Sequence, residues 1–138
     1  MRHDSKYYGS LLVLLAALSG CSKPVRLPAE IAERLGQVDR IVVTNSHLSS
    51  PLTVTGEEVR KVAKAVASAK HDGHSSDGIW NWDIQFYQGT NFVTVIHLMD
   101  RTFWTEDAQF RDDTGVLKAF YRRVLEDADR LERGAGRK

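Results

Sequence analysis

Two histidines and two aspartates lie close together in the middle of the chain and could ligate a metal ion. They occur in the segment His71-Asp72-Gly73-His74-Ser75-Ser76-Asp77-Gly78. Imidazole and carboxylate groups can hold zinc or copper, but a firm site needs three or four converging ligands. His47 or His97 could complete the set, although a strand position makes His97 a hydrogen-bonded structural histidine instead. The sequence favours a polar loop without metal, and a metal-binding or enzymatic module using His71 to Asp77 is the alternative.

Three tryptophans form a second set with a chemical use, because aromatic rings can stack on a sugar or on a peptidoglycan strand. Trp80 and Trp82 alternate with Ile84 and Phe86 in a period of two. That period places all four on one face of a strand, and the buried side of a sheet accounts for them. Trp104 has threonines around it, so a core position and a binding platform both stay open for this residue.

Acidic side chains occur without the partners that catalysis needs. Glu57-Glu58 and Asp112-Asp113 stand at the starts of predicted helices, where acids interact favourably with the helix dipole. Glu106 and Asp107 lie in a polar connection with no matched base or nucleophile. The sequence has no glycine-rich phosphate loop and no G-x-S-x-G nucleophile elbow. We therefore expect no catalytic residues, no cofactor and no metal ligands, and we expect that the protein is not an enzyme.

Cys21 is the only cysteine among the 138 residues, and it follows a leader built like a secretion signal. Residues 1–8 carry Arg2, His3 and Lys6 against one acid, and residues 11–18 are all apolar. Crossing a bilayer takes about 20 apolar residues, so this run is too short to span one but suits a signal peptide. A cleaved leader with a coincidental cysteine and a short uncleaved anchor are the alternatives to a modified cysteine.

Leu18-Ser19-Gly20-Cys21 closes the apolar run with an apolar residue, two small residues and the cysteine. This stretch resembles the lipobox of bacterial lipoproteins. The resemblance covers residues 1–21. It implies that the Cys21 sulfur receives a diacylglycerol, that the leader is cut between Gly20 and Cys21, and that the new amino terminus is acylated, with palmitate as a typical chain. Several acyl chains anchor a protein stably, whereas one holds it only marginally.

The resemblance also bears on location. An aspartate after the lipidated cysteine is the usual signal for inner-membrane retention in enteric bacteria, and this chain has Ser22 there. We therefore expect a cell-membrane lipoprotein that faces away from the cytoplasm. The periplasmic face of the outer membrane is favoured if the cell has one.

Charge and cysteine content limit the classes of function for the remaining 118 residues. The leader removes Arg2, Lys6 and Asp4, so 17 basic and 17 acidic residues remain and the mature chain is formally neutral. This balance argues against a nucleic-acid binder and against a polybasic membrane patch. Without a second cysteine the fold has no disulfide, so packing alone must stabilise it.

The pattern of apolar residues predicts one domain between a tether and a short tail. We expect a signal peptide (1–20), a lipidated tether (21–27), a single α+β domain (28–131) and a frayed tail (132–138). Within the domain Thr55-Gly56-Glu57-Glu58 matches a capping box, which predicts that the Thr55 hydroxyl begins a helix. The expected elements are a helix at 28–35, strands at 38–44 and 52–54, a helix from 55 to about 69, strands at 79–87, 92–99 and 102–105, and a helix at 115–131.

These elements fit an α+β two-layer sandwich. We expect a mostly antiparallel sheet of about four strands, packed by two amphipathic helices, after an N-terminal signal helix. The layout is similar to small, uncharacterised α+β domains of bacterial lipoproteins, a likeness that carries no function. The expected function is a membrane-anchored lipoprotein. Its non-catalytic periplasmic or extracytoplasmic domain would bind a protein or another envelope component.

Overall fold

The computed structural model describes residues 26–74, 82–106 and 108–136. The signal helix, Cys21 and all but the last two residues of the tether lie outside this part of the chain. Trp80, Asp77 and Asp107 also lie outside it, and so does the side chain of His74. The predictions made for these residues stay predictions.

The described residues form a seven-stranded antiparallel sheet with the order β2-β1-β4-β5-β6-β7-β3. The prediction of an antiparallel sheet is confirmed, and the number of about four strands is wrong. The strands are β1 (Arg40–Thr44), β2 (Leu52–Thr55), β3 (Lys70–His74), β4 (Trp82–Gln88), β5 (Asn91–Met99), β6 (Thr102–Trp104) and β7 (Ala108–Arg111).

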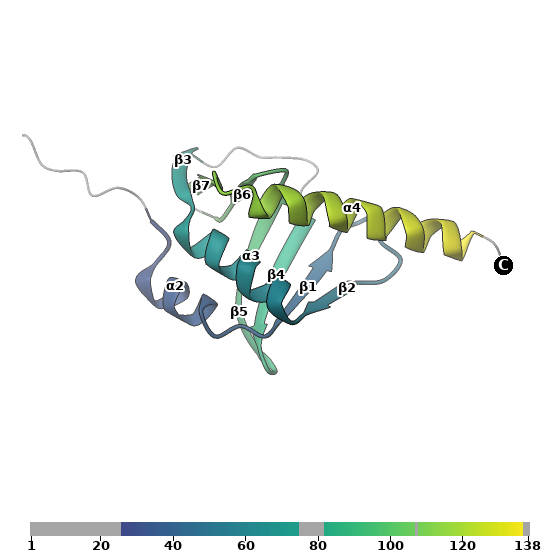
Figure 1. Cartoon of the computed structure of the whole chain (residues 1–138), viewed down its shortest axis with the longest axis horizontal. Helices are drawn as coiled ribbons and strands as arrows, with labels where there is room; N and C mark the ends of the chain where they lie inside the picture. The colour runs from purple at the N-terminus through teal and green to yellow at the C-terminus, as the bar shows by residue number, and fades with distance from the viewer. Residues whose placement is uncertain (1–25, 75–81, 107, 137–138) are drawn as a thin grey trace, which may run out of the picture.

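Three helices cover one face of this sheet, so the fold is α+β as expected (Figure 1). They are α2 (Ala29–Leu35), α3 (Glu57–Ser68) and α4 (Val116–Ala135). The two amphipathic helices of the prediction are α3 and α4, and α4 continues four residues beyond its expected end. The short helix α2 also packs on the domain, because Leu35 is buried and Ile31 contacts the core. None of the described helices is long and apolar enough to cross a membrane.

Alternating side chains explain why only one face of the sheet is covered. In β4 the residues Trp82, Ile84 and Phe86 are buried, and the residues between them are half-exposed. In β1 the same pattern buries Ile41 and Val43. Since successive side chains of a strand point to opposite faces, the buried set faces the helices. The second set forms the other face, which we call the open face because no described helix lies on it.

The sequence did not predict two of the strands, β3 and β7, and β3 was missed because its residues are polar. The segment from His71 to Gly78 was expected to be a loop, and the structure corrects this: its first half belongs to β3. Strand β3 pairs with β7, and the register shifts between His71 and His74. Edge strands commonly carry charges and irregularities of this kind, which hide them from a search for apolar alternation.

The two long helices begin differently from the prediction. The capping box at the start of α3 is wrong: the cap residue is Gly56, at a φ of 83°, and no side chain caps the helix. At α4 the cap comes from Asp112, which is buried. Its carboxylate accepts hydrogen bonds from the Leu117 N–H at 2.9 Å and from the Thr114 N–H and hydroxyl at 2.9 and 2.6 Å. The structural role expected for Asp112 is therefore confirmed.

Candidate functional site

The open face carries a row of polar side chains from adjacent strands. In the middle of the sheet Asp83 of β4 lies opposite His97 of β5, and the Asp83 Oδ1 to His97 Nδ1 distance is 2.6 Å. The next strand places Trp104 opposite His97, and β7 places Gln109 opposite Trp104. Because paired residues share a face, these side chains lie in one row across the sheet. The row was not predicted from the sequence.

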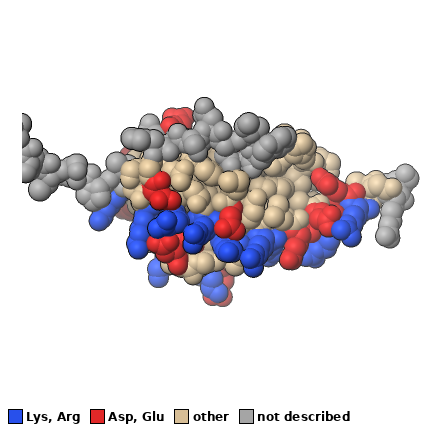
Figure 2. Space-filling model, turned by 90° about the horizontal axis from the view of Figure 1, so that it is seen from above, with Lys and Arg blue, Asp and Glu red and all other residues tan. Residues whose placement is uncertain are grey.

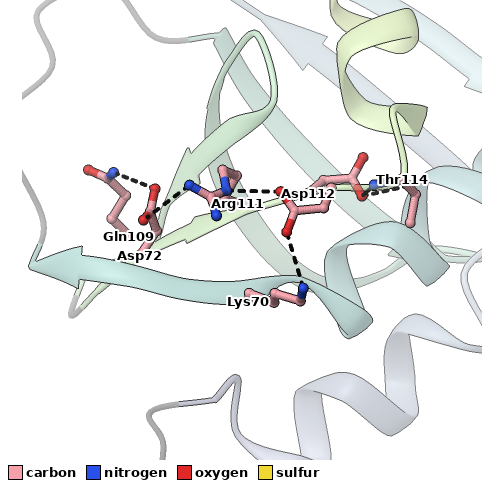
Figure 3. Close-up of polar contacts among 7 residues, drawn as sticks. Lys70, Asp72, Gln109, Arg111, Asp112 and Thr114 are labelled. Carbon is pink, nitrogen blue, oxygen red and sulfur yellow. Dashed lines mark hydrogen bonds and ion pairs between the residues drawn. The ribbon is translucent and has the colours of Figure 1, made fainter.

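The row continues to the β3 edge as a chain of hydrogen bonds and ion pairs. Trp104 Nε1 donates to Gln109 Oε1 at 2.9 Å, and Gln109 Nε2 donates to Asp72 Oδ2 at 3.5 Å. Arg111 then lies 3.7 Å from Asp72 (Figure 3). We call this series, together with the Asp83–His97 pair, the polar row.

Asp113 ends the polar row beside two cations. Its carboxylate lies 3.3 Å from Lys70 Nζ and accepts a 2.9 Å hydrogen bond from Arg111 Nε. The hydrogen bond with Lys70, and then the bond and charge of Arg111, hold the pKa of Asp113 below its ordinary value. Asp113 lies at the surface with 38% of its side chain exposed, so this shift concerns a solvated ion pair. A structural role explains this acid, as the sequence indicated.

Four of the residues considered as metal ligands are described with their side chains (His47, His71, Asp72 and His97), and these four do not come together. His71 and Asp72 are neighbours in β3 and point to opposite faces: the His71 ring contacts Phe110, whereas Asp72 binds Gln109 and Arg111. His97 lies in the central strand β5, and its Nδ1 is occupied by Asp83. His47 follows β1, which lies at the other end of the sheet from β3. Within the described residues no three His, Cys, Asp or Glu side chains form a metal-binding group.

The described tryptophans are buried on opposite faces of the sheet. Trp82 faces the helices beside Ile84, as the alternation predicted. Trp104 lies on the open face by its pairing with His97, yet only 6% of it is exposed. Its indole N–H is taken by Gln109. Neither ring is therefore a free platform for stacking on a sugar, and the two residues stabilise the two sides of the sheet.

The other acidic residues considered for catalysis are Glu57, Glu58 and Glu106. The first two form ion pairs with neighbouring cations, and Glu106 has no such pair within the described residues. Glu57 pairs with Lys61 one turn later on α3, at 3.1 Å. Glu58 accepts a 2.7 Å hydrogen bond from Arg123 of α4, which ties the two helices together. Glu106 lines an apolar groove of about 400 Å³ between the start of α2 and strands β5 and β7, with Leu27 and Phe92. No nucleophile contacts it among the described residues.

His97 with Asp83 is the arrangement nearest to catalytic chemistry. A carboxylate that binds Nδ1 orients the imidazole and leaves Nε2 for another partner. General base catalysis also needs a nucleophile or substrate proton within hydrogen-bond reach. Among the described residues Asp83 is the hydrogen-bond partner of the His97 ring, and the pair bridges β4 and β5. This matches the interpretation from the sequence.

The sequence contains a weak signal for β7, the unpredicted strand that carries Gln109 and Arg111 of the polar row. Ala108-Gln109-Phe110-Arg111 alternates small or apolar residues with polar ones, which is the strand period of two. Four residues are too few to separate this pattern from a loop.

Comparisons with known proteins add no relative: no family model, no curated protein and no solved structure matches the chain. Its function must therefore be argued from its own residues.

Proposed function

We propose that this protein is a bacterial lipoprotein whose domain binds a protein partner through the open face and catalyses no reaction. The observation that carries the proposal is the one-sided burial of the sheet. Three helices cover one face of the seven-stranded sheet, and half-exposed side chains of mixed character line the other face at β1, β4 and β5. A broad surface held on a rigid sheet suits recognition of another protein, since it needs little rearrangement on binding.

The chemistry of the open face supports a protein partner. Near its centre Val95 and Gln85 lie opposite each other on β5 and β4, and both are half-exposed. Tyr87 donates a 2.9 Å hydrogen bond to Gln85 and contacts the exposed ring of Phe92 edge to face. Apolar and aromatic groups with hydrogen-bonding neighbours are typical of protein interfaces.

The anchoring part of the proposal rests on the leader. A basic start, a short apolar run and Leu18-Ser19-Gly20-Cys21 occur in the order that lipoprotein processing requires. Lipid on Cys21 then holds the domain at a membrane, and Ser22 favours the periplasmic face of an outer membrane. The six residues from Ser22 to Leu27 reach about 20 Å when extended, so the domain stays near the lipid.

Site-specific crosslinking in intact cells tests the open face. A photoreactive amino acid is placed at Gln85, and a second one is placed at Glu126, which is exposed on α4. We expect a discrete protein adduct from position 85 and none from position 126, because only the first lies on the open face. Equal adducts from both positions, or none from position 85, would contradict the proposal.

A matched pair of substitutions separates binding from folding. Val95→Glu puts a charge on the open face next to position 85, and Leu125→Glu puts the same charge at a partly exposed apolar site on α4. We expect Val95→Glu to remove the adduct and Leu125→Glu to leave it, with both variants folded by circular dichroism. Loss of the adduct in both variants would refute a specific role for the open face.

A further inference from the structure

The charges of α4 are segregated along the helix although the mature chain is neutral. Its first half carries Lys118, Arg122 and Arg123 and no acid. The second half carries four acids against two arginines: Glu126, Asp127, Asp129 and Glu132 against Arg130 and Arg133. One end of the helix is therefore basic and the other is acidic, which the overall composition does not reveal.

Helix α3 adds cations beside the basic end of α4. The two helices enclose a groove of about 430 Å³, with Lys61 and Arg123 at its rim. Lys64 is exposed one turn along α3 from Lys61. The groove has an apolar floor formed by Val62, Val116, Ala119 and Phe120. We call this surface the basic helix surface. Its acids are Glu57, Glu58 and Asp127, the last of which pairs with Arg123. They stand against five cations: Lys61, Lys64, Lys118, Arg122 and Arg123.

Three of these cations are not neutralised by neighbours. Lys61 pairs with Glu57, and Arg123 pairs with Glu58 and Asp127. Lys64, Lys118 and Arg122 are exposed and form no ion pair within the described part of the chain. An exposed cation without a partner keeps its full attraction for an external anion, whereas a paired one does not.

The basic helix surface lies on the side of the domain where the tether enters. Helix α2 directly follows the tether, and it shares the helix layer with α3 and the first half of α4 (Figure 1). Viewed from above, blue Lys and Arg atoms run along the helix edge of the molecule from the tether side to the C-terminal end, with red Asp and Glu atoms among them (Figure 2). Helix α2 is itself balanced, with Glu30 and Glu33 against Arg34 and the preceding Arg26.

We propose that the basic helix surface rests on the anionic headgroups of the membrane that carries the lipid anchor. This inference builds on the anchoring part of the proposed function. Attraction between exposed charges fades over about 8–10 Å at physiological salt, and the short tether keeps the domain within reach of the lipid. The acidic end of α4 then points away from the membrane, and so does the open face, which stays accessible to a partner.

The single cysteine makes orientation measurable in the lipidated protein. Lipid blocks Cys21, so a cysteine introduced elsewhere takes up a fluorophore at one site only. Ala119→Cys labels the basic helix surface, and Thr53→Cys labels an exposed position on β2. The labelled protein is reconstituted on phosphatidylcholine vesicles with or without phosphatidylglycerol, together with lipids that carry a quencher in the headgroup. We expect quenching of the label at position 119 only with phosphatidylglycerol, and little at position 53.

Neutralising substitutions test whether the charges cause this orientation. We compare two states of the anchored domain: one with the basic helix surface on the membrane and one held by the lipid alone. Each cation near an anionic surface changes the ratio of the first state to the second about fivefold. Lys64→Gln, Lys118→Gln and Arg122→Gln should each lower that ratio about fivefold, and together about 100-fold. Arg101→Gln removes an exposed cation at the turn between β5 and β6 and should have little effect. High salt should act like the triple variant.

Different results would contradict the orientation of the domain on the membrane and the lipid anchor on Cys21. Equal quenching at positions 119 and 53, or quenching unchanged in the triple variant, would overturn the orientation. An acidic protein crosslinked at position 119 in cells, without quenching on vesicles, would also overturn it. Failure of the protein to float with phosphatidylcholine vesicles contradicts the lipid anchor alone. The same quenching assay with Cys21 replaced by serine then decides the orientation, because the label again has one site.

Discussion

Replacing Asp112 with alanine removes the carboxylate that holds the start of α4. In the folded protein this buried side chain accepts hydrogen bonds from the N–H groups of Thr114 and Leu117 and from the Thr114 hydroxyl. In the variant, water can reach Thr114, which is exposed, but the buried N–H of Leu117 loses its partner. The local cost is therefore concentrated on one backbone group, the Leu117 N–H that Asp112 caps.

The size of the effect follows from this one loss. A buried N–H without a partner costs about 1–3 kcal/mol, and the loss of a helix cap, which is the same hydrogen bond, is measured at about 0.5–2 kcal/mol. We therefore expect Asp112→Ala to lower the free energy of unfolding by about 2 kcal/mol. With a urea dependence of about 1.5 kcal/mol per molar for a domain of this size, the unfolding midpoint should fall by about 1.3 M.

Urea unfolding followed by circular dichroism measures this shift. Asp113→Ala is the matched control, because it removes a neighbouring carboxylate that is exposed and caps no helix. Asp112→Asn keeps an acceptor for Leu117 without the charge, so its midpoint should lie between those of Asp112→Ala and the natural protein. A midpoint for Asp112→Ala no lower than that of Asp113→Ala would refute this account of how α4 begins.

Three further predictions concern the anchor, an ion pair and the core. Cys21→Ser should abolish fatty-acid labelling and release the protein from membranes; a variant that still carries fatty acid would contradict lipidation. The lowered pKa of Asp113 means that its ion pair stabilises the fold above the ordinary pKa of 3.8 and that this contribution disappears as the pH falls through the lowered pKa. NMR titration of Lys70→Met should show the Asp113 pKa moved back up, and an unchanged pKa would show that Lys70 is not the main cause. Phe86→Ala should lower the free energy of unfolding by about 3–5 kcal/mol, because the ring is fully buried; a loss under 1 kcal/mol in urea unfolding would show a core that collapses around the gap.

The sequence predicts the fold best where local patterns and tertiary packing agree. Alternation from Trp82 to Phe86 marks β4, since every second residue faces the helices. The apolar stripe of α4 likewise identifies its buried face. The capping box at Thr55 fails because Gly56 adopts a positive φ and takes the cap position itself. A sequence pattern names residues that can cap a helix, but the backbone decides which of them does.

The candidate site is less predictable because it depends on pairing between distant strands. Asp83 meets His97, and Asp72 meets Gln109, only because the sheet places their strands in register. Nothing local in the sequence encodes that register. The proposed lipidation of Cys21 is the opposite case: its signal consists of neighbouring residues, so it can be proposed without any knowledge of the fold.

The order of strands in the sheet also sets the order in which the chain can assemble. Strands β4 to β7 follow one another and pair with their neighbours, whereas β3 sits at the edge and pairs with β7 from much later in the chain. Contacts between distant segments form slowly because they must first close a long loop. When the chain is synthesised from its amino terminus, β3 therefore has no strand to pair with until β7 has been made. An unpaired strand can pair with strands of other chains. The charges of Lys70 and Asp72 and the positive φ at Gly73 make β3 less prone to such pairing.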